Sequence, residues 1–136
     1  MSDNSPTTES RLDPDRWIDQ LPPAEALAVM LDNQAEAIPA LYAALPAIDV
    51  AVAALHQRLL AGCGRLIYVG AGTSARIGVQ DGAELLPTFD FPAKRVGFVI
   101  AGGPQALLRP VENAEDSADA ATQQLDELAI TPDDCL

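Results

Sequence analysis

Apolar residues in the first half of the chain recur at spacings of three, four and seven, which is the period of an amphipathic helix. The pattern predicts a helical region over residues 17–62, in which a first helix begins after Pro22-Pro23. We expect a break near Asp32-Asn33 or before Pro39, and then a further helix over residues 47–61. The apolar positions that carry this pattern on both sides of the break are Leu27, Met30, Leu31, Ile38, Leu41 and Leu45.

The period changes after residue 62. Residues 65–70 (RLIYVG) and 95–103 (RVGFVIAGG) are short, apolar and β-branched, and they are typical of buried parallel strands. The helix-compatible residues 74–86 lie between them, so the pattern predicts a right-handed strand–helix–strand unit. A second helical stretch is expected over residues 104–129, interrupted at Pro110, before a loop that leads into a third strand.

These elements predict an α/β protein in three parts. Residues 1–16 are rich in Ser, Thr, Asp and Pro and are expected to form a flexible arm. The helical region follows, and residues 63–136 form the first part of a parallel-sheet domain of the Rossmann-like, flavodoxin-like type. Two strands and the start of a third leave that sheet with few neighbours, which indicates a truncated domain.

Charge and composition limit the partners. The net charge of −12 disfavours nucleic acid and anionic membrane surfaces. The apolar residues 37–55 are long enough to span a membrane, but Pro39, Pro46 and Asp49 argue against it. Cys63, Cys135 and the single His56 do not have zinc-ligand spacing, so we expect no metal and reduced thiols in a cytoplasmic protein.

The residues GAGTSA, 70–75, follow the first strand and open a helix. Glycines let a backbone approach an anion, and helix N-terminal amides donate to it. A dinucleotide would need an acidic residue after the second strand, which instead ends VIAGG, and a Walker A loop would need lysine. The hydroxyls of Thr73 and Ser74 can contact a phosphate beside the backbone amides, one of them can simply cap the helix, and both can hold at once. We therefore favour a sugar phosphate bound by Gly70, Gly72, Thr73 and Ser74.

The wider segment GRLIYVGAGTSARIGVQDGAELLPTF, residues 64–89, resembles the signature of the N-acetylmuramic acid 6-phosphate etherases, members of the sugar isomerase (SIS) superfamily. The segment VIAGGPQALLRPVENAEDS, residues 99–117, is similar to a second family motif. The resemblance covers most of the chain, which is about half the length of such an enzyme. It implies an incomplete SIS phosphosugar-binding domain and a homodimer, or association with a second SIS half.

The resemblance also implies that two glutamates carry the reaction, Glu84 as the acid and Glu115 as the candidate base. From the residues alone, each is more simply read as a solvated surface side chain. The implied reaction cleaves the lactyl ether and gives N-acetylglucosamine 6-phosphate and D-lactate. One carboxyl group removes the C2 proton while the other protonates the departing oxygen, so no cofactor is needed. The alternative is a non-catalytic SIS-type regulatory module that binds a phosphosugar.

Four residues depart from the family's pattern, and one of them is Pro110, at a position where family members rarely carry proline. Ala75 replaces a glycine where backbone and ligand are expected to approach closely, and Leu86 replaces a proline. Asn113 also replaces a glycine, and asparagine tolerates the left-handed conformation that glycine would supply. These departures suggest a divergent member.

Overall fold

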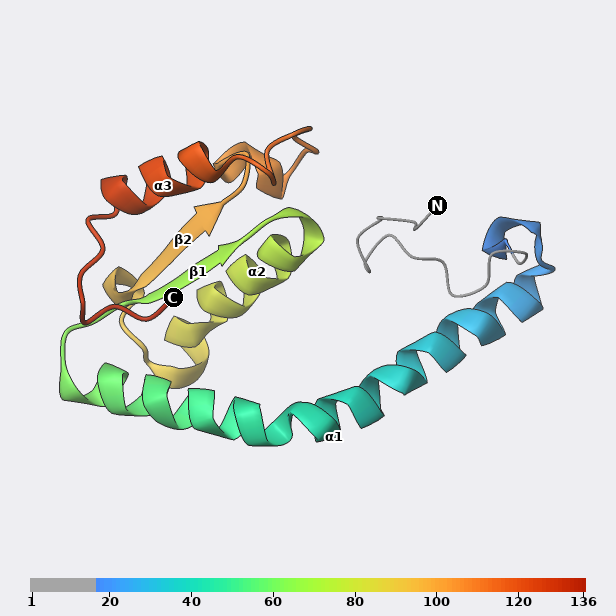
Figure 1. The fold of residues 1–136 in the computed structure, drawn as a ribbon, viewed down its shortest axis with the longest axis horizontal. Coiled ribbons are helices and arrows are strands. Elements are labelled where there is room, and N and C mark those ends of the chain that lie inside the picture. The colour runs from blue at the N-terminus through green and yellow to red at the C-terminus, as the bar shows by residue number, and fades with distance from the viewer. Residues whose placement is uncertain (1–16) are drawn as a thin grey trace, which may run out of the picture. The chain divides into compact units, whose positions relative to one another are not determined.

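The computed structural model describes residues 17–136, so the arm expected over residues 1–16 lies outside the described residues. The described chain divides into two compact units at Asp49/Val50, and each is considered by itself. Figure 1 shows the order of the elements. It confirms the α/β prediction of a long helical region followed by parallel strands and helices.

The helical region contains η2, Ile18–Gln20, and one helix, α1, Pro23–Ala61. The expected break near Asp32-Asn33 or before Pro39 is wrong, because α1 runs through both Pro39 and Pro46. Each proline removes one backbone donor, whereas the alanine- and leucine-rich turns around it keep theirs. By length and composition α1 is also apolar enough to cross a membrane. Its avoidance of membranes stays a prediction.

The sheet contains β1, Leu66–Gly70, and β2, Val96–Ile100, in parallel register with Leu66 opposite Val96. Leu66 also forms a parallel bridge to Cys135 on its other side. The amide of Ile67 donates to the carbonyl of Cys135 at 2.8 Å, and the amide of Cys135 donates to Arg65 at 2.8 Å. Within the described residues the expected third strand amounts to this one bridge, which lies on the side of β1 opposite β2.

Two helices cover opposite faces of the sheet (Figure 1). The helix α2, Gly72–Phe89, packs on the face formed by Tyr68 and Phe98, whose rings stack with centroids 5.7 Å apart. On the other face lies α3, Ala118–Glu127. Short helical turns η3, Ala93–Arg95, and η4, Pro104–Leu107, precede and follow β2. Helix over residues 108–117 was predicted wrongly, since a folded loop replaces it around Pro110.

A charged clamp joins the two ends of the α/β unit. The Asp134 side chain is only 2% exposed and meets Arg65 at 2.7 Å. It also accepts the Arg65 amide at 2.7 Å and the Thr131 amide and hydroxyl. The hydrogen bonds from Arg65 hold the pKa of the Asp134 carboxyl well below its usual range. Further Arg65 bonds to the carbonyls of Leu128 and Ala129 fix the end of α3.

Removal of this charge is expected to destabilise the chain. Asp134→Asn should lower Tm by roughly 10 °C at neutral pH, because Arg65 loses its buried anion. A carboxyl whose folded pKa is depressed stabilises the fold above its unfolded pKa, near 4, and loses that contribution as pH falls. The Tm difference between parent and variant should therefore shrink from pH 5 to pH 2. Asp133→Asn, at the exposed neighbour, is the control, and an equal shift there would contradict the assignment.

A second prediction concerns the contact between α2 and the sheet. A Cβ at Gly82 would lie 2.8 Å from Phe98 Cε1 and 2.9 Å from Tyr68 Cε2. Gly82→Ala should lower the free energy of unfolding by about 1–3 kcal/mol through overpacking, despite alanine's better helix propensity. At Gly62 the nearest atoms would be 3.8 Å away, so Gly62→Ala should be nearly neutral in the same denaturant titration. Equal stability of the two variants would refute this packing argument.

Candidate functional site

The turn between β1 and α2 opens onto free space. Ala71 is extended, with φ −131° and ψ 161°, and Gly72 has a positive φ of 56°. No atom lies within 4 Å of the position that a Cβ on Gly72 would occupy. Glycine is therefore favoured at residue 72 by backbone conformation, and the space above it is available to a ligand.

The first amides of α2 are available to an acceptor. Ala75 N–H donates to the Ala71 carbonyl at 3.1 Å. Within the described residues no hydrogen bond engages the amides of Gly72, Thr73 or Ser74, and no side chain caps the helix. The structural reading of Thr73 or Ser74 as the N-cap is thus wrong. Unpaired amides and the positive end of the helix dipole together suit an anion.

A cavity of about 170 Å³ lies beside this turn. The turn contributes Gly72 and Thr73, and the loop after β2 contributes Glu115. An adjoining hollow of about 200 Å³ reaches Gly70 and again includes Glu115. Sequence-predicted residues from two distant segments therefore meet at the C-terminal ends of the parallel strands, where open α/β sheets bind ligands. Ser74 lines a separate hollow of about 130 Å³ with Gly70.

The loop that carries Glu115 is held by local contacts. A Cβ on Gly102, which has φ 80°, would lie 2.8 Å from Val111 Cβ, so the loop packs closely on the end of β2. Asn113 adopts φ 57°, the left-handed conformation considered from the sequence. Ser117 then caps α3 by accepting the Ala120 amide at 3.3 Å. Glu115 therefore lies between two fixed points of the backbone, the left-handed Asn113 and the helix cap Ser117.

The structure does not bring Glu84 to the same cavity. Glu84 is exposed on α2, twelve residues after Gly72, which corresponds to about 18 Å along the helix axis. It lies on the same face of α2 as Thr73 and Ile77 by helical spacing. No hydrogen bond or ion pair joins either Glu84 or Glu115 to another residue of the described chain. Both carboxylates are therefore open to ligands or to another molecule.

Ala75 differs from its expected position. Its side chain is 8% exposed, and a Cβ built on Gly70 would lie 3.5 Å from Ala75 Cβ. The methyl group thus packs toward β1 and does not line the cavity that contains Glu115. The replacement of glycine by alanine at this position leaves that cavity open.

Three features were missed from the sequence. Arg76 and Arg109 line the cavity with Glu115, and Arg76 Nε donates to the Ala106 carbonyl at 3.0 Å. Arg76 belongs to the sequence TSAR at the candidate turn, from which its place in the site could have been predicted. No motif pointed to Arg109 as a site residue. The third is Tyr68, whose hydroxyl donates to Asp81 at 2.6 Å. Burial, followed by this hydrogen bond, raises the pKa of Tyr68 to about 12.

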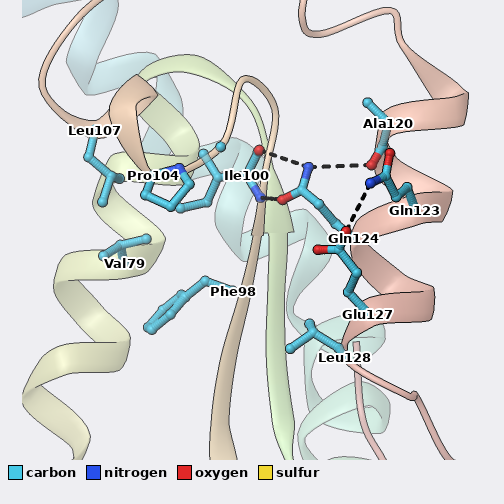
Figure 2. A pocket seen from close by; sticks show the side chains of 11 residues that line it. Val79, Phe98, Ile100, Pro104, Leu107, Ala120, Gln123, Gln124, Glu127 and Leu128 are labelled. Carbon is cyan, nitrogen blue, oxygen red and sulfur yellow. Dashed lines mark hydrogen bonds between the residues drawn. The ribbon is translucent and has the colours of Figure 1, made fainter.

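A larger apolar cavity of about 630 Å³ lies elsewhere, along β2 between α2 and α3 (Figure 2). Phe98 and Val79 line it, and Gln124 donates to and accepts from the Ile100 backbone at 3.2 Å. None of the sequence-predicted site residues lies there. In the part of the chain that the structure describes, no three His, Cys, Asp or Glu side chains gather into a metal site. The cavity beside Gly72 is therefore the candidate site.

Comparison with known proteins places this geometry in context. Residues 48–135 match the family described as the glucokinase regulatory protein N-terminal SIS domain. The chain is 43% identical over 129 residues to the N-acetylmuramic acid 6-phosphate etherase of Rubrobacter xylanophilus, covering 95% of the chain and 42% of the relative. It is 45% identical over 131 residues to the enzyme of that name from Cutibacterium acnes, covering 96% and 43%. The chain thus spans about two-fifths of the length of these curated relatives.

The contact between Tyr68 and Asp81 gives a prediction about this part of α2. Asp81→Asn should lower the pKa of Tyr68 from about 12 toward 10, because a neutral amide no longer opposes the phenolate. The value should stay above 10, since burial is the larger cause. Ultraviolet titration of tyrosinate in a Tyr42→Phe background isolates this group. Glu84→Gln is the control, and an unchanged midpoint for Asp81→Asn would contradict the assignment.

Proposed function

Because the chain belongs to the family described as the glucokinase regulatory protein N-terminal SIS domain, we propose that it binds a phosphosugar and contributes to cleavage of the lactyl ether of N-acetylmuramic acid 6-phosphate. The observation that carries this proposal is the cavity shared by Gly72, Thr73 and Glu115. The similarity of the chain to proteins named N-acetylmuramic acid 6-phosphate etherase, at 43–45% identity, supports the choice of substrate.

The phosphoryl group is assigned to the turn. The unpaired amides of Gly72, Thr73 and Ser74 supply donors in neighbouring positions, and the Thr73 hydroxyl lies at the same helix start. A phosphate there benefits from both hydrogen bonds and the helix dipole. This arrangement requires no basic residue in the turn, which agrees with the absence of lysine from GAGTSA.

The sugar then lies toward Glu115. Glu115 acts as the base. Its carboxylate removes the proton at C2 of the ring-opened aldehyde, and the electron pair of the broken C2–H bond forms the C2–C3 double bond. The C3–O bond breaks, and the departing lactate oxygen takes a proton from the acid, Glu84. Addition of water across the double bond gives N-acetylglucosamine 6-phosphate. The two carboxyl groups must therefore hold opposite protonation states at the start.

The separation of Glu84 from the cavity favours a site made by two copies. Within one copy, about 18 Å along α2 separates Glu84 from the turn, which is more than a single hexose phosphate spans. In the homodimer that the resemblance implies, α2 of a second copy can supply Glu84. Ile77, on the same helix face, is 62% exposed and offers apolar surface for such a contact.

The second candidate is a regulatory module that binds a phosphosugar without cleaving it. The description of the matching family as a regulatory protein supports it. Both functions predict that N-acetylglucosamine 6-phosphate raises Tm, and only the lyase predicts release of D-lactate. A parent chain that binds the sugar and releases no lactate, alone or joined to the remaining length of its relatives, would favour regulation.

Glu115→Gln tests the catalytic assignment. It should reduce D-lactate release by about 10²–10⁴-fold, because the amide cannot accept the C2 proton, and should leave phosphosugar binding nearly unchanged. A coupled D-lactate dehydrogenase assay and calorimetry measure the two quantities. Glu112→Gln, three residues away and outside the cavity, is the control. Parallel loss in both variants would argue against Glu115.

Mixing variants tests the shared site. Glu84→Gln and Glu115→Gln should each be inactive alone, whereas reassociated mixtures should recover about a quarter of the parent activity, since half of the dimers are mixed and each mixed dimer has one intact site. Each variant unfolded and refolded alone is the control. Failure to recover activity in mixtures shown to contain mixed dimers would contradict a site built from two copies.

A further inference from the structure

We propose that Arg109 binds the carboxylate of the substrate's lactyl arm and so distinguishes the etherified sugar from a plain hexosamine phosphate. This inference rests on the proposed function, because only that substrate carries a second anionic group beside its phosphate. It goes further by assigning the recognition of that group to a side chain outside the phosphate-binding turn.

Cations are scarce in this chain, and three of the five arginines in the described residues are engaged by the fold. The sequence has 8 Lys and Arg against 20 Asp and Glu. Arg58 donates to the Pro132 carbonyl at 3.0 Å, and Arg65 is held by Asp134. Arg95 donates to Gly64 and Leu59, and its guanidinium lies over the ring of Phe91. These three arginines serve the fold.

The two remaining arginines of the described chain line the same cavity, beside the candidate turn. Arg76 is the fifth residue of α2, and its Nε donates to the Ala106 carbonyl at 3.0 Å. The Arg109 side chain is exposed and forms no hydrogen bond or ion pair with any described residue. Neither arginine is paired with Glu115. The cavity therefore holds Glu115 together with two guanidinium groups, and neither group forms an ion pair with it or with another described carboxylate.

The two arginines lie on different segments, and we therefore assign them to different groups of the ligand. Arg76 follows Gly72 by four residues and lies on the side of the turn, so it supports the phosphoryl group. Arg109 lies on the opposing loop, which also carries Glu115. Its amide donates to the Gln105 carbonyl at 3.1 Å, and Pro110 restricts the following backbone. A guanidinium carried by such a segment presents a planar pair of donors that matches a carboxylate.

This arrangement fits the chemistry of the ether. The lactyl carboxylate lies two bonds from the ether oxygen, so a contact with Arg109 holds the leaving group while Glu115 faces the sugar carbon. Product without the lactyl arm loses that contact and keeps the phosphate contacts. Arg109 is thus a specificity and positioning residue, and it neither donates nor accepts the transferred proton.

Binding to two ligands tests the inference. In a Glu115→Gln background, which prevents turnover, Arg109→Gln should weaken N-acetylmuramic acid 6-phosphate about tenfold by calorimetry. Binding of N-acetylglucosamine 6-phosphate should change less than twofold. Arg76→Gln should weaken both ligands. Lys94→Gln removes one exposed positive charge outside the cavity and should change neither, which controls for net charge.

The outcomes separate this inference from the proposed function. If Arg109→Gln keeps the parent Tm and weakens both ligands equally, or weakens neither, the assignment to the carboxylate is wrong while the phosphosugar site stands. If the Glu115→Gln chain binds neither ligand, both proposals fall. A folding defect in Arg109→Gln is avoided by Arg109→Lys, which keeps the charge without the planar fork and should restore part of the preference for the lactyl sugar.

Discussion

The pairing of Arg65 with Asp134 is the constraint on which the α/β unit depends. One buried carboxylate receives donors from the start of β1 and from Thr131, and the same arginine binds the carbonyls that follow α3. The segment at Cys135 is thereby held along one side of β1, with β2 along the other. β1 is thus bonded on both sides at its start and to β2 along its length, and the turn that presents the amides of Gly72 and Thr73 follows it directly.

The local elements of this unit could be predicted from the sequence. Apolar, β-branched runs bounded by glycine identified both strands, and the GAGTSA pattern placed the helix start within two residues. The path of α1 through Pro39 and Pro46 could not be predicted, because proline is a general helix breaker and its tolerance depends on the surrounding turns. The loop over residues 108–117 was missed because Val111 packs on Gly102, nine residues earlier, and helical periodicity does not reveal that contact.

The candidate site was predictable in its parts and not in its assembly. Motifs identified the turn, Glu84 and Glu115, and the return of Glu115 to the strand ends followed from the topology of parallel sheets. The distance of Glu84 from the turn follows from helix rise alone, and Glu84 forms no hydrogen bond or ion pair within the described chain. No sequence pattern identified Arg109 as a candidate site residue. Only the structure shows that its side chain lies unpaired beside a cavity of this acidic chain.

The bonds that Gln124 makes to Ile100 have a consequence for the solubility of the chain. The side-chain amide satisfies both the N–H and the carbonyl that this residue turns away from β1 (Figure 2). A foreign strand that approached β2 would have to displace Gln124 before it gained any ladder bond at this point. Gln124 on α3 thus hinders pairing of another chain with the exposed edge of β2 at Ile100. In other proteins lysine or proline on an edge strand has this effect.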